Sequence, residues 1–94
     1  MIVALNDLMA IGAMNAIKEK GLIVGKDIGV TGYDDFPMVS FYSPGLTSVA
    51  QPAKKAGEKV IDLLIDTLHS DKEKGEFNHV ILAPKLIIRE SSIR

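Results

Sequence analysis

Residues 2–35, IVALNDLMAIGAMNAIKEKGLIVGKDIGVTGYDD, decide the fold that we expect. The run opens with residues 2–5, a short aliphatic segment typical of a buried parallel strand. Apolar residues then recur at helical spacing over residues 8–20, and Gly21 follows as a residue that commonly ends a helix. Residues 28–33 are β-branched at alternate places, which predicts a second strand. A strand, a helix and a second strand predict a right-handed parallel βαβ unit.

Downstream of this unit the pattern predicts shorter elements. Residues 37–41 suit one helical turn, Ser43-Pro44-Gly45 a turn, and residues 46–49 a brief strand. Pro52 opens a second predicted helix, residues 52–69, because proline is favoured in the first turn. We expect a solvated loop at residues 70–76 and two short strands at residues 80–82 and 85–89.

Composition narrows the function classes. The 94 residues suit one small domain or part of one, and a net charge of −1 offers no basic stripe to nucleic acid. The absence of cysteine excludes disulfides, thiolate metal sites and thiol nucleophiles. No apolar run reaches the roughly 18 residues of a membrane span, and no secretory signal opens the chain, so we expect a cytoplasmic protein with no membrane partner.

Catalysis finds little support in the sequence. The histidines His69 and His79 flank the charged loop, far from the strand ends, and no glycine-rich phosphate loop is present. Asp34 and Asp35 alone are a weak metal signal. We therefore expect no enzyme activity, no metal and no cofactor.

Polar residues follow both predicted parallel strands. Asn6 and Asp7 follow the first strand, and Asp34 and Asp35 follow the second. In an open parallel sheet, ligands bind beyond the carboxyl ends of the strands, so these groups are expected to converge on one crevice. An amide donates and accepts hydrogen bonds whereas a carboxylate accepts them, a pairing that suits the hydroxyls of a polyol. The alternative is that Asp7 and Asp35 cap helices and Asn6 fills a turn.

Aromatic and apolar residues crowd the loop at residues 36–42, and two interpretations stay open. The loop carries Phe36, Met38, Val39, Phe41 and Tyr42. These side chains either pack over the sheet or form a subunit interface, where aromatic residues and methionine are favoured.

Three segments carry a specific resemblance. They are NDLMAIG at residues 6–12, DIGVTGYDD at residues 27–35 and PGLTSVAQ at residues 44–51. The chain resembles the lactose/galactose repressor family of bacterial transcriptional regulators over nearly its whole length. The resemblance implies an α/β, three-layer Rossmann-like fold with a mostly parallel sheet, namely the C-terminal portion of a periplasmic-binding-protein-like core. It also implies a small-molecule effector, a sugar or sugar derivative, and contact with DNA only through a helix-turn-helix domain that this chain lacks.

The resemblance also assigns roles to residues. Asn6 and Asp34 match the cleft residues that contact effector hydroxyls, and Gln51 matches a glutamine at the hinge crossover beside the cleft. Ala53 stands where some members place an aromatic residue that stacks on the ligand, which leaves the effector's identity open. The resemblance also implies a homodimer whose interface contains Ile11, Phe36, Met38, Phe41 and Tyr42.

The resemblance divides the chain. Residues 1–50 and 85–94 correspond to the C-terminal subdomain of the family core, and residues 52–83 to elements of the N-terminal subdomain. The apolar stripe of helix 52–69 then needs a cover, so we expect the chain to be part of a larger protein, to fold the helix back or to swap it with a second copy. The predicted function is effector sensing and dimerisation in a transcriptional repressor. The alternatives are a fragment of a periplasmic sugar-binding transport protein, or an interaction module that pairs with intact repressors.

Overall fold

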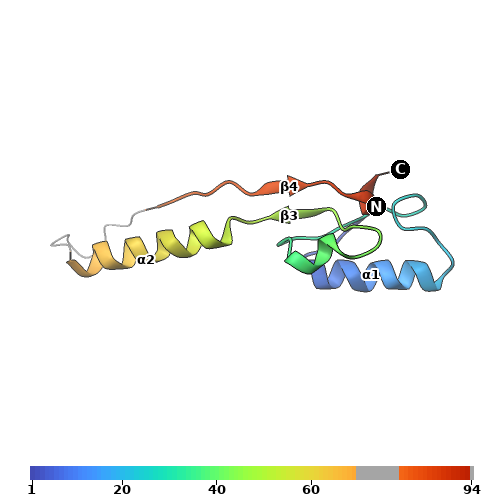
Figure 1. The fold of residues 1–94 in the computed structure, drawn as a ribbon, viewed down its shortest axis with the longest axis horizontal. Coiled ribbons are helices and arrows are strands. Elements are labelled where there is room, and N and C mark those ends of the chain that lie inside the picture. The colour runs from blue at the N-terminus through green and yellow to red at the C-terminus, as the bar shows by residue number, and fades with distance from the viewer. Residues whose placement is uncertain (70–78, 94) are drawn as a thin grey trace. The chain divides into compact units, whose positions relative to one another are not determined.

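The computed structural model describes residues 1–69 and 79–93, in which strands and helices alternate (Figure 1). In chain order the elements are β1 (Ile2–Val3), α1 (Asp7–Glu19), β2 (Val30–Thr31), η1 (Pro37–Ser40), β3 (Ser48–Ala50), α2 (Ala53–His69), β4 (Lys85–Ile87) and η2 (Glu90–Ser92), where η marks a 3-10 helix. The predicted loop at residues 70–76 lies outside the described residues. The chain forms two compact units: unit 1, Met1–Gln51 with Pro84–Arg94, and unit 2, Pro52–Ala83.

Helix α1 begins and ends at residues that cap it. Asn6 has extended backbone, and its side-chain oxygen accepts a hydrogen bond from the Met9 N–H at 2.9 Å. Gly21, with φ of +74°, follows the last turn and donates its N–H to the Lys18 carbonyl at 2.9 Å. The first predicted helix is therefore confirmed, with its ends displaced by one residue.

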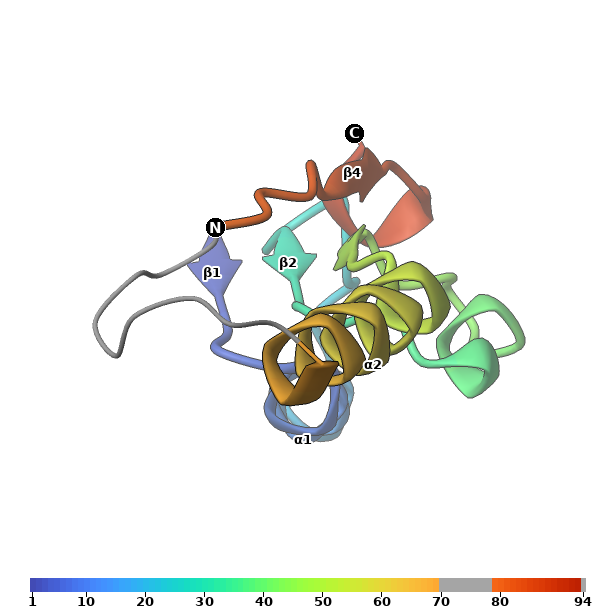
Figure 2. The ribbon, with the colours of Figure 1, turned by 90° about the vertical axis from the view of Figure 1, so that its left-hand side faces the viewer.

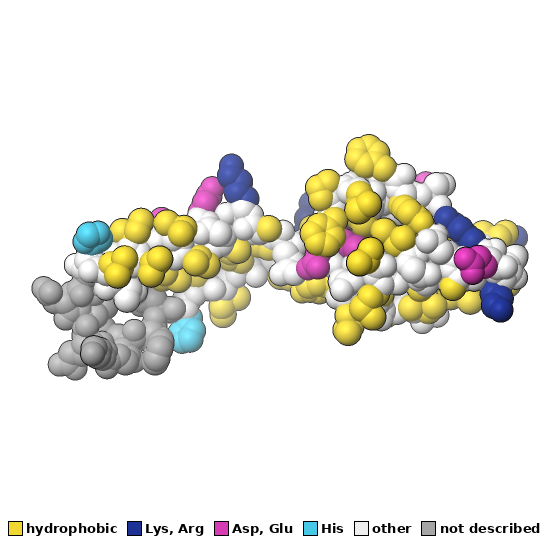
Figure 3. Space-filling view, turned by 90° about the horizontal axis from the view of Figure 1, so that it is seen from below, with side chains coloured by type: hydrophobic (Ala, Val, Ile, Leu, Met, Phe, Trp, Pro, Cys, Tyr) yellow, Lys and Arg dark blue, Asp and Glu magenta, His cyan; other side chains and the backbone are white. Residues whose placement is uncertain are grey.

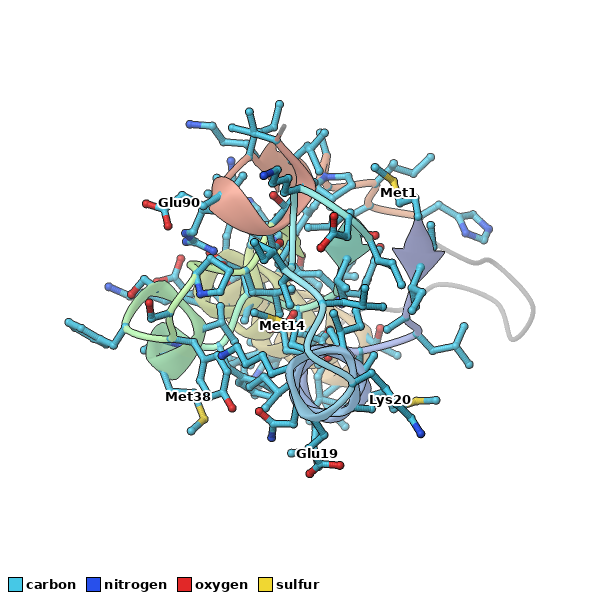
Figure 4. The ribbon with its side chains drawn as sticks, turned by 90° about the vertical axis from the view of Figure 1, so that its right-hand side faces the viewer. Met1, Met14, Glu19, Lys20, Met38 and Glu90 are labelled. Atoms are coloured by element: carbon cyan, nitrogen blue, oxygen red, sulfur yellow. The ribbon has the colours of Figure 1, made fainter. Side chains whose placement is uncertain are left out.

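One face of α1 packs against the strands of unit 1. Ala10, Met14 and Ile17 are buried on this face, and Figure 4 shows Met14 in the interior of the unit. Leu8 belongs to the predicted apolar set but is 76% exposed. The reason is that successive helical residues are about 100° apart, and at this end of α1 it is Asp7 that faces inward.

The strands of unit 1 follow one another in a mostly parallel order. β1 and β2 pair in parallel, with Ile2 opposite Val30, and lie side by side above α1 in Figure 2. A parallel bridge between Thr31 and Thr47 joins β2 to the segment that leads into β3. The last pairing, between β3 and β4, is antiparallel. The predicted α/β class with a mostly parallel sheet is confirmed.

The strand predictions need five corrections. The second strand is shorter than residues 28–33, and the strands predicted at residues 46–49 and 85–89 are Ser48–Ala50 and Lys85–Ile87. The first strand is not buried throughout: Ala4 packs in the core beside α1, whereas Val3 and Leu5 are exposed, because successive side chains of a strand point to opposite faces. Residues 80–82 form no strand, since no described segment pairs with their backbone groups.

The core of unit 1 lies between α1 and the strands. Its buried apolar side chains are Ala4, Ala10, Met14, Ile17, Val24, Val30, Val39 and Leu46. The C-terminal segment is held to this core by Ser91, whose buried hydroxyl donates to the Val30 carbonyl at 2.6 Å and accepts from the Thr47 N–H at 2.8 Å. Residues distant in sequence therefore share one packed unit.

Unit 2 is built differently, because α2 buries none of its residues. Its apolar stripe stays largely exposed at Val60, Ile61, Leu64, Ile65 and Leu68. Within this unit the described residues offer no apolar partner that covers the stripe.

Among residues 1–69 and 79–93, no helix combines the length and the apolarity that crossing a bilayer requires.

We expect Met14→Ala to lower the free energy of unfolding of unit 1 by about 2–5 kcal/mol, because it leaves a cavity in the core. Leu64→Ala should change it by less than about 0.5 kcal/mol, since Leu64 is 51% exposed and lies in unit 2. Tyr33 and Tyr42 are the chain's two tyrosines and both lie in unit 1, so tyrosine fluorescence in urea reports this unit. Equal losses in the two variants would contradict the division into units.

Candidate functional site

The two polar segments meet at the carboxyl edge of the β1–β2 pair. The Ala4 N–H donates to the Thr31 carbonyl at 2.9 Å, and the Asp7 N–H donates to the Tyr33 carbonyl at 3.1 Å. The second bond joins the residue after Asn6 to the residue before Asp34. The backbones of Asn6 and Asp34 therefore leave the sheet at the same edge, as the parallel register requires.

Two of the predicted site residues are in direct contact. The Gln51 side-chain amide donates to Asp34 Oδ1 at 2.7 Å. The Asp34 N–H donates to the Val49 carbonyl at 2.9 Å, which holds the loop after β2 beside β3. Gln51 is exposed and Asp34 is half-buried, so this pair lies at the surface of unit 1.

The remaining hydrogen-bonding capacity suits a hydroxylated ligand. Asn6 uses its side-chain oxygen as the cap of α1, which leaves its NH2 group as a donor. Within the part of the chain that the structure describes, Asp34 has a hydrogen bond at Oδ1 and none at Oδ2. A carboxylate acceptor and amide donors at one edge can bind the two sides of a hydroxyl group.

The turn that carries Asp34 has unusual backbone geometry. Asp34 has φ of +104° and Asp35 has φ of +55°. Non-glycine residues in this region cost about 1–3 kcal/mol each, and the conformation persists only where the surroundings hold it. Here the N–H groups of Asp34, Asp35 and Phe36 all have hydrogen-bond acceptors, which are respectively Val49 O, Ser48 Oγ and Asp7 Oδ2.

The proposed capping roles of Asp7 and Asp35 are wrong. Asn6 is the cap of α1, while Asp7 is only 1% exposed and accepts hydrogen bonds from Ser48 and Phe36. Asp35 forms an ion pair with Arg89, whose Nη1 lies 2.6 Å from Asp35 Oδ1 and 2.7 Å from the Leu46 carbonyl oxygen.

Sequence reasoning missed Asp7 as a buried acceptor and missed Ser48 and Arg89 altogether. Ser48 Oγ and Asp7 are 41 residues apart, and Arg89 and Asp35 are 54 residues apart. The only available signal was the polar character of Ser48 and Arg89 in the segments predicted as apolar strands, residues 46–49 and 85–89.

A second candidate site is the apolar face, which we define as Leu8, Met9, Phe36, Met38 and Phe41. All five side chains are at least half exposed, and Figure 3 shows hydrophobic side chains gathered on one side of unit 1. Met38 lies at the outer surface of η1 in Figure 4. The hydrogen bond between Phe36 and Asp7 holds the loop of η1 beside the start of α1.

The other residues of the aromatic loop pack inward. Val39 is fully buried in the core, so packing explains why an apolar residue stands at this position of the loop. Ile11 and Tyr42 are partly buried against the core, and the Tyr42 hydroxyl donates to Asn15 Oδ1 at 2.6 Å. The Lys18 ammonium lies 5.0 Å from the centre of the Tyr42 ring, within the range of a cation–π contact.

No cluster of three or more histidine, aspartate or glutamate residues that could hold a metal occurs among residues 1–69 and 79–93. An open groove of about 360 Å³ lies on unit 2, lined by Lys59, Asp62, Leu63, Ile65, Asp66 and Val80. It contains none of the candidate site residues, and uncovered apolar side chains of α2 form part of its wall, so we assign it no ligand.

The chain matches a known protein family over nearly its whole length. Residues 2–92 match the family of periplasmic binding protein-like domains. The chain is 39% identical over 87 residues to the HTH-type transcriptional repressor PurR of Haemophilus influenzae, and 41% identical over 90 residues to the HTH-type transcriptional regulator MalR of Clostridium butyricum. These alignments cover 92% and 96% of the chain and 26% of each relative, so the chain spans about a quarter of their length.

Solved structures of transcriptional regulators contain the same fold. A lac repressor dimer bound to operator and the anti-inducer ONPF superimposes with a TM-score of 0.87 at 36% identity, over 98% of this chain and 27% of that one. A LacI family regulator from Enterococcus faecium with bound ribose has a TM-score of 0.84 at 30% identity, over 97% of this chain and 33% of that one. The periplasmic-binding-protein-like fold expected from the sequence is confirmed.

A double-mutant cycle of Asp35→Asn and Arg89→Met should give a coupling free energy of about 0.5–3 kcal/mol, because the two side chains are in contact and partly shielded from solvent. Urea unfolding of the four proteins measures it. The control is the cycle of Asp35→Asn with Lys85→Met, an exposed lysine of β4, for which we expect additivity. Additive losses in the first cycle would contradict the ion pair.

Proposed function

Because the chain belongs to the LacI family of transcriptional regulators, we propose that it forms part of the effector-binding and dimerisation core of a repressor. The observation that carries the proposal is the position of Asn6 and Asp34 at one carboxyl edge, with Gln51 bonded to Asp34. Ligands of open parallel sheets bind at such an edge. The repressor itself would act in the cytoplasm, where its DNA is.

The effector that fits this edge is a small neutral molecule rich in hydroxyl groups, such as a sugar or sugar derivative. Asp34 Oδ2 would accept a hydroxyl proton, and the Asn6 NH2 group would donate to a hydroxyl oxygen. Gln51 would orient Asp34 and contact the ligand. Ala53 offers no aromatic surface for stacking, so hydrogen bonds would dominate recognition.

The mechanism that we propose is a shift between two conformations of the regulator. Residues 1–50 and 85–94 would form one subdomain of the core, and residues 52–83 would supply elements of the other. Two compact units and the uncovered stripe of α2 support this division. An effector that binds both subdomains favours their closed arrangement, and the resulting change alters the affinity of separate helix-turn-helix domains for DNA.

Homodimer formation is the second part of the proposal. The apolar face would lie in the interface together with Ile11 and Tyr42, because exposed aromatic and methionine side chains are enriched at such surfaces. The lac repressor that matches this chain is a dimer in its crystal structure.

Two alternative functions have less support. A monomeric sugar-binding protein of a transporter would not need the apolar face, and the relatives cited above are HTH-type transcriptional regulators. A hydrolytic enzyme would need a nucleophile and a second group that acts as acid or base, and of Asn6, Asp34 and Gln51 only Asp34 can take either role.

We expect Asp34→Ala to abolish the response to the effector while operator binding persists, because the substitution removes the hydroxyl acceptor but leaves the fold of α1 and the strands. The test uses the gene product that contains these residues, with operator binding measured by fluorescence anisotropy against a panel of neutral sugars. Glu19→Ala, at the exposed end of α1, is the matched carboxylate control. An unchanged response in Asp34→Ala would contradict the assignment of the effector site.

Phe41→Asp should dissociate the dimer, because Phe41 is 88% exposed in the single chain and would place a charge in an apolar interface. Light scattering at micromolar concentration measures the mass. Ile23→Asp changes an exposed apolar residue outside the apolar face and should leave the dimer intact. A monomeric wild-type protein would contradict this part of the proposal.

A further inference from the structure

The buried carboxylate of Asp7 is not explained by helix capping, because Asn6 already caps α1. Burying a charged group is costly unless its oxygens are hydrogen-bonded. Both oxygens of Asp7 have donors: Ser48 Oγ donates to Oδ1, and the Phe36 N–H donates to Oδ2 at 2.8 Å. The Asp7 carboxylate therefore bonds to β3 through one oxygen and to the turn after β2 through the other.

Ser48 extends the reach of Asp7 by one residue. Its hydroxyl accepts a hydrogen bond from the Asp35 N–H at 3.1 Å and donates its proton to Asp7. A hydroxyl can do both at once because it has one proton and two lone pairs. Asp7 therefore holds the Phe36 N–H directly and the Asp35 N–H through Ser48.

Asp7 also holds the chain on the other side of Asp34. The Asp7 N–H donates to the carbonyl of Tyr33, which directly precedes Asp34. A single residue thus fixes the backbone before and after the Asp34–Asp35 pair, where both φ angles are positive. Space for the carboxylate exists because residue 32 is glycine: a Cβ at Gly32 would collide with Asp7 Oδ1 and lie 3.0 Å from the Leu46 side chain.

We propose that Asp7 is a positioning residue that sets the conformation of the turn at residues 34–36 and thereby the direction of the Asp34 carboxylate toward its ligand. The inference rests on the proposed function, in which Asp34 contacts the effector. Asp7 itself is buried and does not touch the ligand. Its role goes beyond stabilising the fold, because two of its hydrogen bonds reach Tyr33 and Phe36 on either side of the Asp34–Asp35 pair. The third reaches the Asp35 N–H indirectly, through Ser48.

The test is NMR spectroscopy of the 15N-labelled chain with Asp7→Asn. A side-chain amide has one acceptor oxygen, so the substituted side chain cannot accept from both Phe36 and Ser48 in their present positions. We expect the Asp35 or Phe36 amide to exchange at least about tenfold faster, while the Met14 amide in α1 stays within about threefold of wild type. We also expect the Gln51 side-chain amide resonances to move to the position of a free glutamine, because the bond to Asp34 is lost.

The Gln51 side-chain amide resonances distinguish a role of Asp7 in positioning the Asp34 carboxylate from a role in stabilising the fold alone. Faster exchange in the turn with unchanged Gln51 resonances would overturn the proposal, and so would no change in either signal. Ser48→Ala removes the hydroxyl that connects Asp7 to the Asp35 N–H and leaves the carboxylate in place. If Asp7→Asn does not fold, the same two signals are measured in Ser48→Ala, and the same results uphold or overturn the proposal. Asp27→Asn is the matched control, since Asp27 Oδ2 accepts from the Ile23 N–H at 2.7 Å elsewhere in unit 1.

This experiment involves no effector, so its outcome is independent of whether an effector is found. A loosened turn in a protein that binds none of the sugars tested would uphold the role of Asp7 and count against the proposed function. An unchanged turn in a protein that loses its response with Asp34→Ala would do the reverse.

Discussion

The parallel pairing of β1 with β2 is the constraint on which the site depends. Parallel strands end at the same edge, and two hydrogen bonds, from Ala4 to Thr31 and from Asp7 to Tyr33, carry the pairing up to that edge. Asn6 and Asp34 are therefore neighbours although 28 positions separate them (34 − 6). Antiparallel pairing would have placed the polar segments at opposite ends of the sheet.

The two units differ in how far this chain stabilises them. Unit 1 buries a continuous apolar core around Met14, and its C-terminal segment is tied to β2 through Ser91. In unit 2, α2 is amphipathic but buries none of its residues. Hydrophobic burial is the dominant favourable term in folding, so unit 2 needs additional apolar surface from other polypeptide to reach comparable stability. Membership of a family whose members cited here are about four times as long is consistent with this need.

Elements that depend on local sequence could be predicted, and contacts between distant segments could not. The end of α1 at Gly21 could be predicted because capping involves only neighbours in the chain, although the cap at its start is Asn6 and not Asp7. The extent of each strand was predicted wrongly because a strand forms only where a partner strand lies, and no described residue pairs with residues 80–82. Of the site, the positions of Asn6 and Asp34 after two predicted strands indicated these residues, and the resemblance to a family added Gln51. The buried role of Asp7 depends on Ser48, 41 positions away. The contact of Gln51 with Asp34 was likewise invisible in the linear pattern.

The central claim is that Asn6, Asp34 and Gln51 face one ligand at one edge. The most direct measurement is an NMR titration of the chain with a panel of neutral sugars. It follows the side-chain amide resonances of Asn6 and Gln51. The account predicts that both pairs shift together with a single apparent Kd for at least one sugar, and that Asp34→Ala abolishes both shifts. Shifts confined to one of the two amides, or shifts that persist in Asp34→Ala, would contradict a shared site.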